Sequence, residues 1–198
     1  MSLKCCTLLL LLGFCTNSIL AQNTIETEKQ RKTSKPKNLR LLLGGALEFG
    51  GDDLAEVYFV DGSIQKMKAG QGGSVYAGGQ LALNKEQTFF LRGSIGIKYL
   101  TTKADNAHIR LTRFPLQGTL NYFPVKKLRL GAGIVSHQGI KVNFDGLGDN
   151  QEFTASPGPV FEVSYAGIGL SYTALTYKDA GQQSFKANAI GITFSGVL

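Results

Sequence analysis

The amino-acid sequence predicts an all-β fold, an antiparallel up-and-down barrel of eight strands. Three observations lead to this prediction. Apolar and polar residues alternate over many short segments, the connections between those segments are long and short in turn, and 25 of the 198 residues are glycine, well above the usual share of roughly 7%. Because the alternation has the two-residue period of a β-strand, each segment has one apolar face and one polar face.

The first element in the chain is typical of a secretory signal peptide. Residues 1–21 have Lys4 near the start, an apolar run in the middle and the small residue Ala21 at the end. We expect cleavage between Ala21 and Gln22, because the apolar run is shorter than the roughly 20 residues of a membrane-spanning helix. All three cysteines lie in this segment, so the mature chain would have no thiol for catalysis, metal binding or disulfides.

Residues 22–38 are predicted to form a disordered basic linker. The segment is polar, nearly free of large apolar side chains and interrupted by Pro36. It holds five of the cations behind the formal charge of +7. The rest of the chain, residues 39–198, has no basic stripe interleaved with aromatic residues, so we expect no nucleic-acid partner.

Eight alternating segments are expected to form the barrel. The connections are residues 50–72, 84–87, 101–109, 123–127, 138–157, 166–167 and 178–184, which leaves strands over 39–49, 73–83, 88–100, 110–122, 128–137, 158–165, 168–177 and 185–198. Most of these strands approach the roughly 9–11 residues that a tilted strand needs to cross a bilayer. Alternating long and short connections are typical of outer-membrane barrels, which have short periplasmic turns and long extracellular loops.

The stretch "FFLRGSIGIKYL", residues 89–100, shows that alternation alone does not decide which face meets solvent. One face is apolar and the other carries Arg92 and Lys98. A soluble, lipocalin-like barrel would point the apolar face inward, and a transmembrane barrel would point it outward. Export, the alternating connections and aromatic residues near strand ends favour the transmembrane barrel; these aromatic residues are Phe49, Tyr99, Tyr122, Tyr165 and Phe194.

The first long connection contains a predicted hairpin of its own. Asp61–Gly62 supplies turn chemistry between two strand-like runs, "EVYFV" and "IQKMK". We expect this hairpin to project from the barrel. If it entered the ring instead, the barrel would have ten strands.

These features together resemble the small eight-stranded outer-membrane β-barrel proteins, a group typified by OmpX and the membrane domain of OmpA. The resemblance covers residues 39–198 and rests on the strand pattern, the first-loop stretch "GGDDLAEVYFVDGSIQKMKAGQG" and the terminal strand "ANAIGITFSGVL". Members of the group usually end on an aromatic residue, whereas Leu198 stands last here and Phe194 lies four residues earlier.

The resemblance implies a monomeric, porin-like barrel in the cell outer membrane of a Gram-negative bacterium, with both termini in the periplasm. Its expected partners are outer-membrane lipid and the barrel-assembly machinery, and no extracellular partner can be named. The resemblance implies no cofactor.

The outward apolar face predicts a polar network in the lumen. An eight-stranded barrel is just wide enough to be filled by its side chains, and buried charges must pair or be hydrated. We therefore expect a largely plugged lumen and a structural or surface-interaction role, with a narrow channel for small polar or anionic solutes as the alternative. The predicted network is Arg40, Glu48, Arg92, Lys98, Arg113, Arg129 and Glu162.

Two further groups of side chains raise the question of catalysis or metal binding. Ser136 and His137 suggest a lipid-modifying enzyme, but adjacent strand residues point to opposite faces and make a poor nucleophile and base. We expect His108 to be a solvated loop residue. No catalytic or metal site is expected, because the remaining acidic group lacks the ligand spacing of a calcium loop; it comprises Asp145, Asp149 and Glu152.

Overall fold

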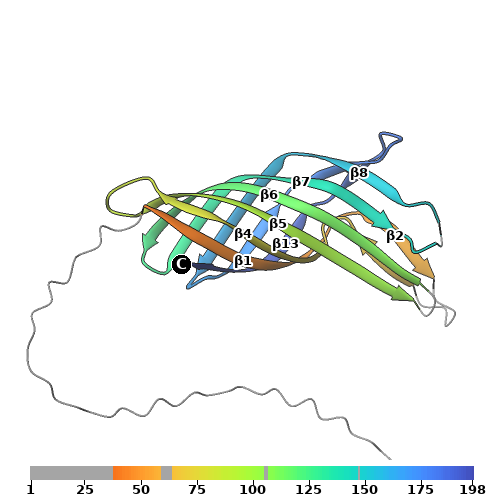
Figure 1. The fold of residues 1–198 in the computed structure, drawn as a ribbon, viewed down its shortest axis with the longest axis horizontal. Helices are drawn as coiled ribbons and strands as arrows, with labels where there is room; N and C mark the ends of the chain where they lie inside the picture. The colour runs from red at the N-terminus through yellow and green to blue at the C-terminus, as the bar shows by residue number, and fades with distance from the viewer. Residues whose placement is uncertain (1–37, 59–63, 105–106, 147) are drawn as a thin grey trace, which may run out of the picture. The chain divides into compact units, whose positions relative to one another are not determined.

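The computed structural model describes residues 38–58, 64–104, 107–146 and 148–198, and the predicted signal peptide and nearly all of the linker lie outside them. The described residues form β-strands and no helix. Eight strands make a closed antiparallel ring, in which β13 pairs with β1 to complete the barrel (Figure 1). This confirms the predicted fold class. The ring order is β1 (Leu39–Phe49), β4 (Gly72–Ala82), β5 (Phe89–Ala104), β6 (Ala107–Val125), β7 (Leu128–Asn143), β9 (Gly158–Tyr165), β10 (Ile168–Thr173) and β13 (Ala189–Val197).

Five further strands lie outside the ring. β2 (Asp53–Tyr58) and β3 (Ile64–Lys68) pair with each other in a separate two-stranded sheet, so the ten-strand alternative is wrong. The predicted turn at Asp61–Gly62 lies outside the described residues. β8 (Gln151–Ser156), β11 (Thr176–Lys178) and β12 (Ser184–Lys186) continue the sheet sideways from the end of β7.

Three ring strands are longer than the sequence predicted. β5 runs on to Ala104, β6 starts at Ala107 and β7 runs on to Asn143. The predicted connections 101–109 and 138–157 are therefore wrong in their bounds. His108 lies in β6, paired with Lys103 of β5, and is not a loop residue.

A β-bulge in β7 explains one of these errors. Thr112 of β6 pairs with Lys141 whereas Phe114 pairs with Gln138, so β7 holds one extra residue at this point. Gly139 lies there with φ 56°, a conformation that glycine adopts without strain. The extra residue shifts which side chains point inward, so the alternation stops at His137 although the strand continues.

The strand bounds also differ near the end of the chain. β10 ends at Thr173, and the predicted strand 168–177 breaks there before β11 begins outside the ring. β13 starts at Ala189, four residues later than predicted. The alternating residues on the two sides of the last long loop form β11 and β12, which belong to the sideways sheet and not to the ring.

The apolar faces of the ring strands point outward. On β5, Phe89 is 42% exposed and Ile95 59% exposed, while Arg92 and Lys98 are 8% and 1% exposed. The same holds around the whole ring, where apolar side chains exposed on the outer surface include Leu41, Leu47, Val75, Leu116, Leu130, Ile134, Phe161, Leu170 and Ile190.

The apolar core lies at one end of the barrel. We call this the loop end, because the β2–β3 hairpin and the β8–β11–β12 sheet are both there, and we call the opposite end, with the turns 83–88, 126–127 and 166–167, the turn end. The core joins these appendages to the inner faces of β6 and β7 beyond the bulge. Its largest fully buried side chains are those of Met67, Leu111, Ile140, Val142 and Tyr177.

Candidate functional site

The interior of the barrel contains two layers of polar side chains and one open cavity. The turn-side layer and the loop-side layer are separated by a small cavity of about 50 Å³, whose lining includes Tyr76 and Gln117. Between the turn-side layer and the turn end lies a cavity of about 770 Å³, which we call the turn-end cavity.

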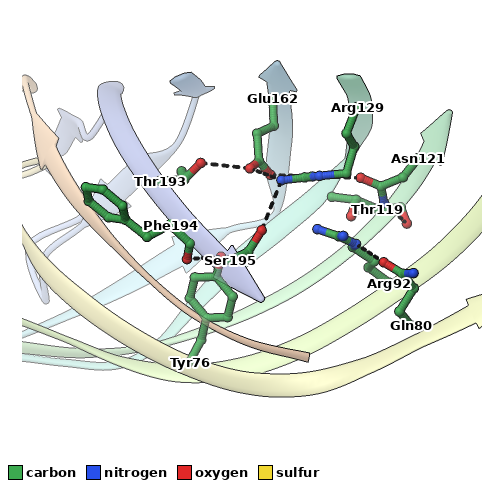
Figure 2. Close-up of polar contacts among 10 residues, drawn as sticks. All are labelled: Tyr76, Gln80, Arg92, Thr119, Asn121, Arg129, Glu162, Thr193, Phe194 and Ser195. Carbon is green, nitrogen blue, oxygen red and sulfur yellow. Dashed lines mark hydrogen bonds and ion pairs between the residues drawn. The ribbon is translucent and has the colours of Figure 1, made fainter. Parts of the chain in front are cut away.

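The turn-side layer is centred on a buried ion pair between Arg129 of β7 and Glu162 of β9, which are 3% and 7% exposed (Figure 2). Arg129 places both terminal nitrogens on the carboxylate and also donates to Asn121 Oδ1, at 2.9 Å. Thr193 Oγ1 donates to Glu162 Oε1 at 2.8 Å. The charges are paired and hydrogen-bonded on several sides, as buried charges need to be.

Arg92 lies beside this pair but does not share its carboxylate. Its Nε donates to Gln80 Oε1 at 2.7 Å (Figure 2). Its guanidinium carbon lies 6.0 Å from the centre of the Phe123 ring. No described acidic residue forms an ion pair with Arg92.

The loop-side layer holds two further buried cations. Lys98 Nζ lies 2.9 Å from Glu48 Oε2 and donates to the carbonyl of Gly70 at 2.7 Å. Arg113 donates to the carbonyls of Ala69 and Gln71, which belong to the chain between β3 and β4. These bonds attach the barrel wall to the first long connection.

His137 completes this layer from β7. It is 4% exposed, and its Nδ1 shares a hydrogen bond with the hydroxyl of Tyr177. Burial raises the pKa of the Tyr177 hydroxyl, which accepts a bond from Arg113 and thus has its proton free for His137. Ser136 points to the other face and accepts a bond from Gln138. Ser136 and His137 therefore do not form a nucleophile and base.

The structure places the seven residues of the predicted lumen network at three heights. Arg40 is at the wall of the turn-end cavity, where it donates to Gln87 Oε1 at 2.8 Å. Arg92, Arg129 and Glu162 belong to the turn-side layer, and Glu48, Lys98 and Arg113 to the loop-side layer.

Sequence reasoning missed several neutral partners of these charges. Asn121 and His137 share the inward parity of Arg113 and Arg129 on their own strands, and Gln80 shares the parity of polar Ser74 on β4. Parity could therefore have placed all three side chains in the interior. Tyr177 gave no such signal, because the chain leaves the ring after Thr173 and the parity of β10 does not carry over.

The acidic residues considered for a metal lie apart. Glu152 pairs with Lys141 at 2.7 Å, and Asp145 lies 3.8 Å from Arg110. Within the described ranges, no three His, Cys, Asp or Glu side chains are placed to hold a metal ion. The same ranges contain no helix able to cross a membrane.

The class of molecule defined by these observations is a closed eight-stranded antiparallel β-barrel with a charged interior and an apolar outer surface. No protein-family model matches the chain, and no curated protein matches it in sequence.

Proposed function

We propose that the chain is an integral outer-membrane β-barrel with a structural or surface-interaction role and a lumen that its own side chains close. The observation that carries this proposal is the apolar outer surface. Large apolar side chains from all eight ring strands are exposed on it, whereas monomeric soluble proteins rarely expose contiguous apolar patches larger than a few hundred Å².

The height of this surface supports the proposal. On β5 the outward apolar face runs from Phe89 to Tyr99, about 33 Å along the strand at roughly 3.3 Å per residue, or about 25 Å in height at a tilt of about 40°. Outer-membrane barrels have an apolar band of about that height. Beyond Tyr99 the next outward residue of β5 is Thr101.

Exposed aromatic residues also gather at the two edges of the band. Strand pairing aligns Phe89 with Tyr122 at the turn end, and their rings stack with centres 4.8 Å apart. Tyr165 and Phe194 are at the same end, both aligned with Ile168. Phe49, Tyr99 and Tyr172 are near the loop end. Two aromatic girdles are a feature of transmembrane barrels.

The proposed orientation puts the turn end in the periplasm and the loop end outside the cell, as in barrels with short periplasmic turns. The loop end, with its hairpin and side sheet, is then the surface available to an extracellular partner. Outer-membrane lipid and the barrel-assembly machinery are the proposed partners of a monomer.

Both alternatives lack a supporting arrangement among the described residues. A narrow channel would have to pass the two polar layers and the apolar core, which contain the fully buried side chains of Arg113, Leu111 and Tyr177. A lipid-modifying enzyme has no Ser136–His137 pair to use, because those side chains lie on opposite faces.

The test is heat-modifiable migration of the purified protein. A folded barrel in lipid vesicles should resist unheated dodecyl sulfate and migrate differently from the boiled sample, and cell fractionation should recover it in the outer membrane. Folding to a monomer in buffer without detergent or lipid would contradict the proposal. Conductance in planar bilayers separately tests the channel.

A further inference from the structure

The turn-end cavity is lined by an excess of cations. Its lining includes five basic residues, and among the described lining residues Glu86 is the one acid. Glu86 lies on the exposed β4–β5 turn, where it accepts a hydrogen bond from Asn84. The five cations are Arg40, Arg92, Lys126, Lys127 and Arg129.

Arg92 is the buried member of this set that forms no ion pair with a described residue. Arg129 is neutralised by Glu162, and Arg40 donates to Gln87. Arg92 is 92% buried, has its Nε on Gln80, and its two terminal nitrogens make no hydrogen bond to any described residue. A buried charge without a counter-charge is costly, and a guanidinium fork matches the paired oxygens of an oxyanion.

The cavity is a blind pocket. Its floor is the turn-side layer, where hydrogen bonds join the Arg129–Glu162 pair to Asn121 and Thr193 (Figure 2). Its mouth carries Lys126 and Lys127, both exposed on the β6–β7 turn. Charges of one sign along low-dielectric walls concentrate ions of the opposite sign.

We propose that this pocket binds a small oxyanion of the phosphate type with two or more negative charges, held at its inner end by the terminal nitrogens of Arg92. The volume of about 770 Å³ lies within the roughly 300–1,000 Å³ of small-molecule sites, so the pocket has room for a molecule larger than a simple ion. Lys126 and Lys127 attract the anion, and Arg40 contacts it from the wall. Because the floor is closed, the pocket binds and does not conduct.

The proposal goes beyond the outer-membrane assignment and is tested without it, by titrating inorganic pyrophosphate into the folded protein in neutral detergent micelles and measuring heat. We expect saturable binding to one site. Arg92→Gln should weaken it by about tenfold or more, because charge-assisted forks are the strongest hydrogen bonds available here. Lys126→Gln combined with Lys127→Gln should weaken it by about threefold and flatten its salt dependence.

The matched control is Arg110→Gln, which removes the same charge at the loop end, where Arg110 is 45% exposed; its affinity should equal that of the unmodified protein. The gel shift establishes folding before each titration. Absence of saturable pyrophosphate binding at millimolar concentration, or equal affinity in Arg92→Gln, would overturn the proposal. If Arg92→Gln does not fold, the double lysine variant and Arg40→Gln test the proposal instead. Both should bind pyrophosphate more weakly, and unchanged affinity in both would overturn the proposal.

A second arm separates two sources of the same chemistry. Short-chain phosphatidylglycerol in the micelles presents a lipid phosphate at the cavity mouth. Competition with pyrophosphate that disappears in Arg92→Gln identifies a lipid headgroup as the ligand, and pyrophosphate binding without competition identifies a soluble phosphate compound.

Discussion

The barrel wall and its extension at the loop end have opposite chemistry on the same strand. Between Ile109 and Tyr122 of β6 the even-numbered side chains point outward; they include apolar Phe114 and Leu116 in the wall but exposed Arg110 in the extension. The odd-numbered side chains point inward; they include Arg113 in the wall but Leu111 in the extension. The backbone remains a continuous β-strand, but within four residues the apolar side chains change from the inner face to the outer face and the charged side chains change from the outer face to the inner face.

Which face of the strand is apolar therefore depends on the surroundings of each part of the strand. In the extension the apolar side chains pack on the hairpin and the side sheet, and Arg110 is exposed on the outer face, 3.8 Å from Asp145. In the wall the interior holds hydrogen-bonded charges, and the apolar side chains cover the outside. The exchange is what we expect where an aqueous exterior gives way to lipid.

The largest effect is expected from breaking the buried charge pair of the wall. Glu162→Gln leaves Arg129 buried without its carboxylate and should lower the free energy of unfolding by about 3–5 kcal/mol. Urea unfolding in vesicles, followed by the gel shift, measures this. The control is Glu152→Gln in the exposed pair with Lys141, which should change stability little. Similar losses in both variants would mean that the two regions do not differ in this way.

The second comparison concerns two leucines of β6. Leu111→Ala opens a cavity in the apolar core and should cost about 2–5 kcal/mol. Leu116 faces outward. On the proposed lipid-covered outer face, lipid chains would fill the space of the missing atoms, so Leu116→Ala should cost clearly less. The same urea titration distinguishes them. A loss for Leu116→Ala as large as that for Leu111→Ala would contradict an outer face in lipid.

The third comparison places one cation at two heights on the outer face of β5. Ile95→Arg lies in the apolar band and should reduce insertion into vesicles, because a lipid-facing arginine near the midplane costs about 2–4 kcal/mol. Thr101→Arg lies two residues beyond Tyr99 on the same face and should insert normally. The folded fraction after dilution into vesicles is the measurement. Equal insertion of the two variants would contradict an apolar band that is embedded in lipid at Ile95.

A third arginine substitution on β5 tests which face of the strand points into the barrel. Ser94 points inward, toward the small cavity, so Ser94→Arg should perturb packing or local charge without the lipid cost of its neighbour Ile95→Arg. Soluble, monomeric Ser94→Arg together with aggregated Ile95→Arg would instead favour an apolar interior and a lipocalin-like barrel.

The sequence predicted the ring because alternation is a local property. Each of the eight ring strands lies at one of the predicted alternating segments. Parity grouped the charged residues Arg92, Lys98, Arg113 and Arg129 on the polar faces of their strands, and export, the alternating connections and the aromatic residues near strand ends assigned those faces to the interior, where the structure places them. The exchange of chemistry on β6 is visible in the sequence too. In the sequence this point resembles the end of a strand, because Leu111 is an apolar residue on the odd-numbered face and Phe114 is one on the even-numbered face.

What the sequence did not predict depends on contacts between distant segments. Arg113 donates to carbonyls of residues 69 and 71, and His137 meets Tyr177 across the loop end. The cavity around Arg92 depends on Gln80 and Phe123 from other strands. Parity places each of these side chains on a face, but only the register of the closed ring brings them together.

The smallest effect is expected from the exposed ion pairs of the β2–β3 hairpin, and it contrasts with the buried pair of the wall. Hydrogen bonds from Lys66 and then from Lys68 lower the pKa of Asp53 below its ordinary value of 3.8. Since the folded-state pKa is the lower one, the carboxylate stabilises the hairpin above pH 3.8, and this contribution is lost as the pH falls through the folded-state pKa.

The carboxyl ¹³C shift of Asp53 should therefore titrate below 3.8, and 1 M salt should move the titration back toward that value, because exposed charges are screened. The same salt should leave the stability lost in Glu162→Gln unchanged, because a buried pair is screened much less. A titration of Asp53 at 3.8 or above in low salt would show that the hairpin pairs do not hold in solution.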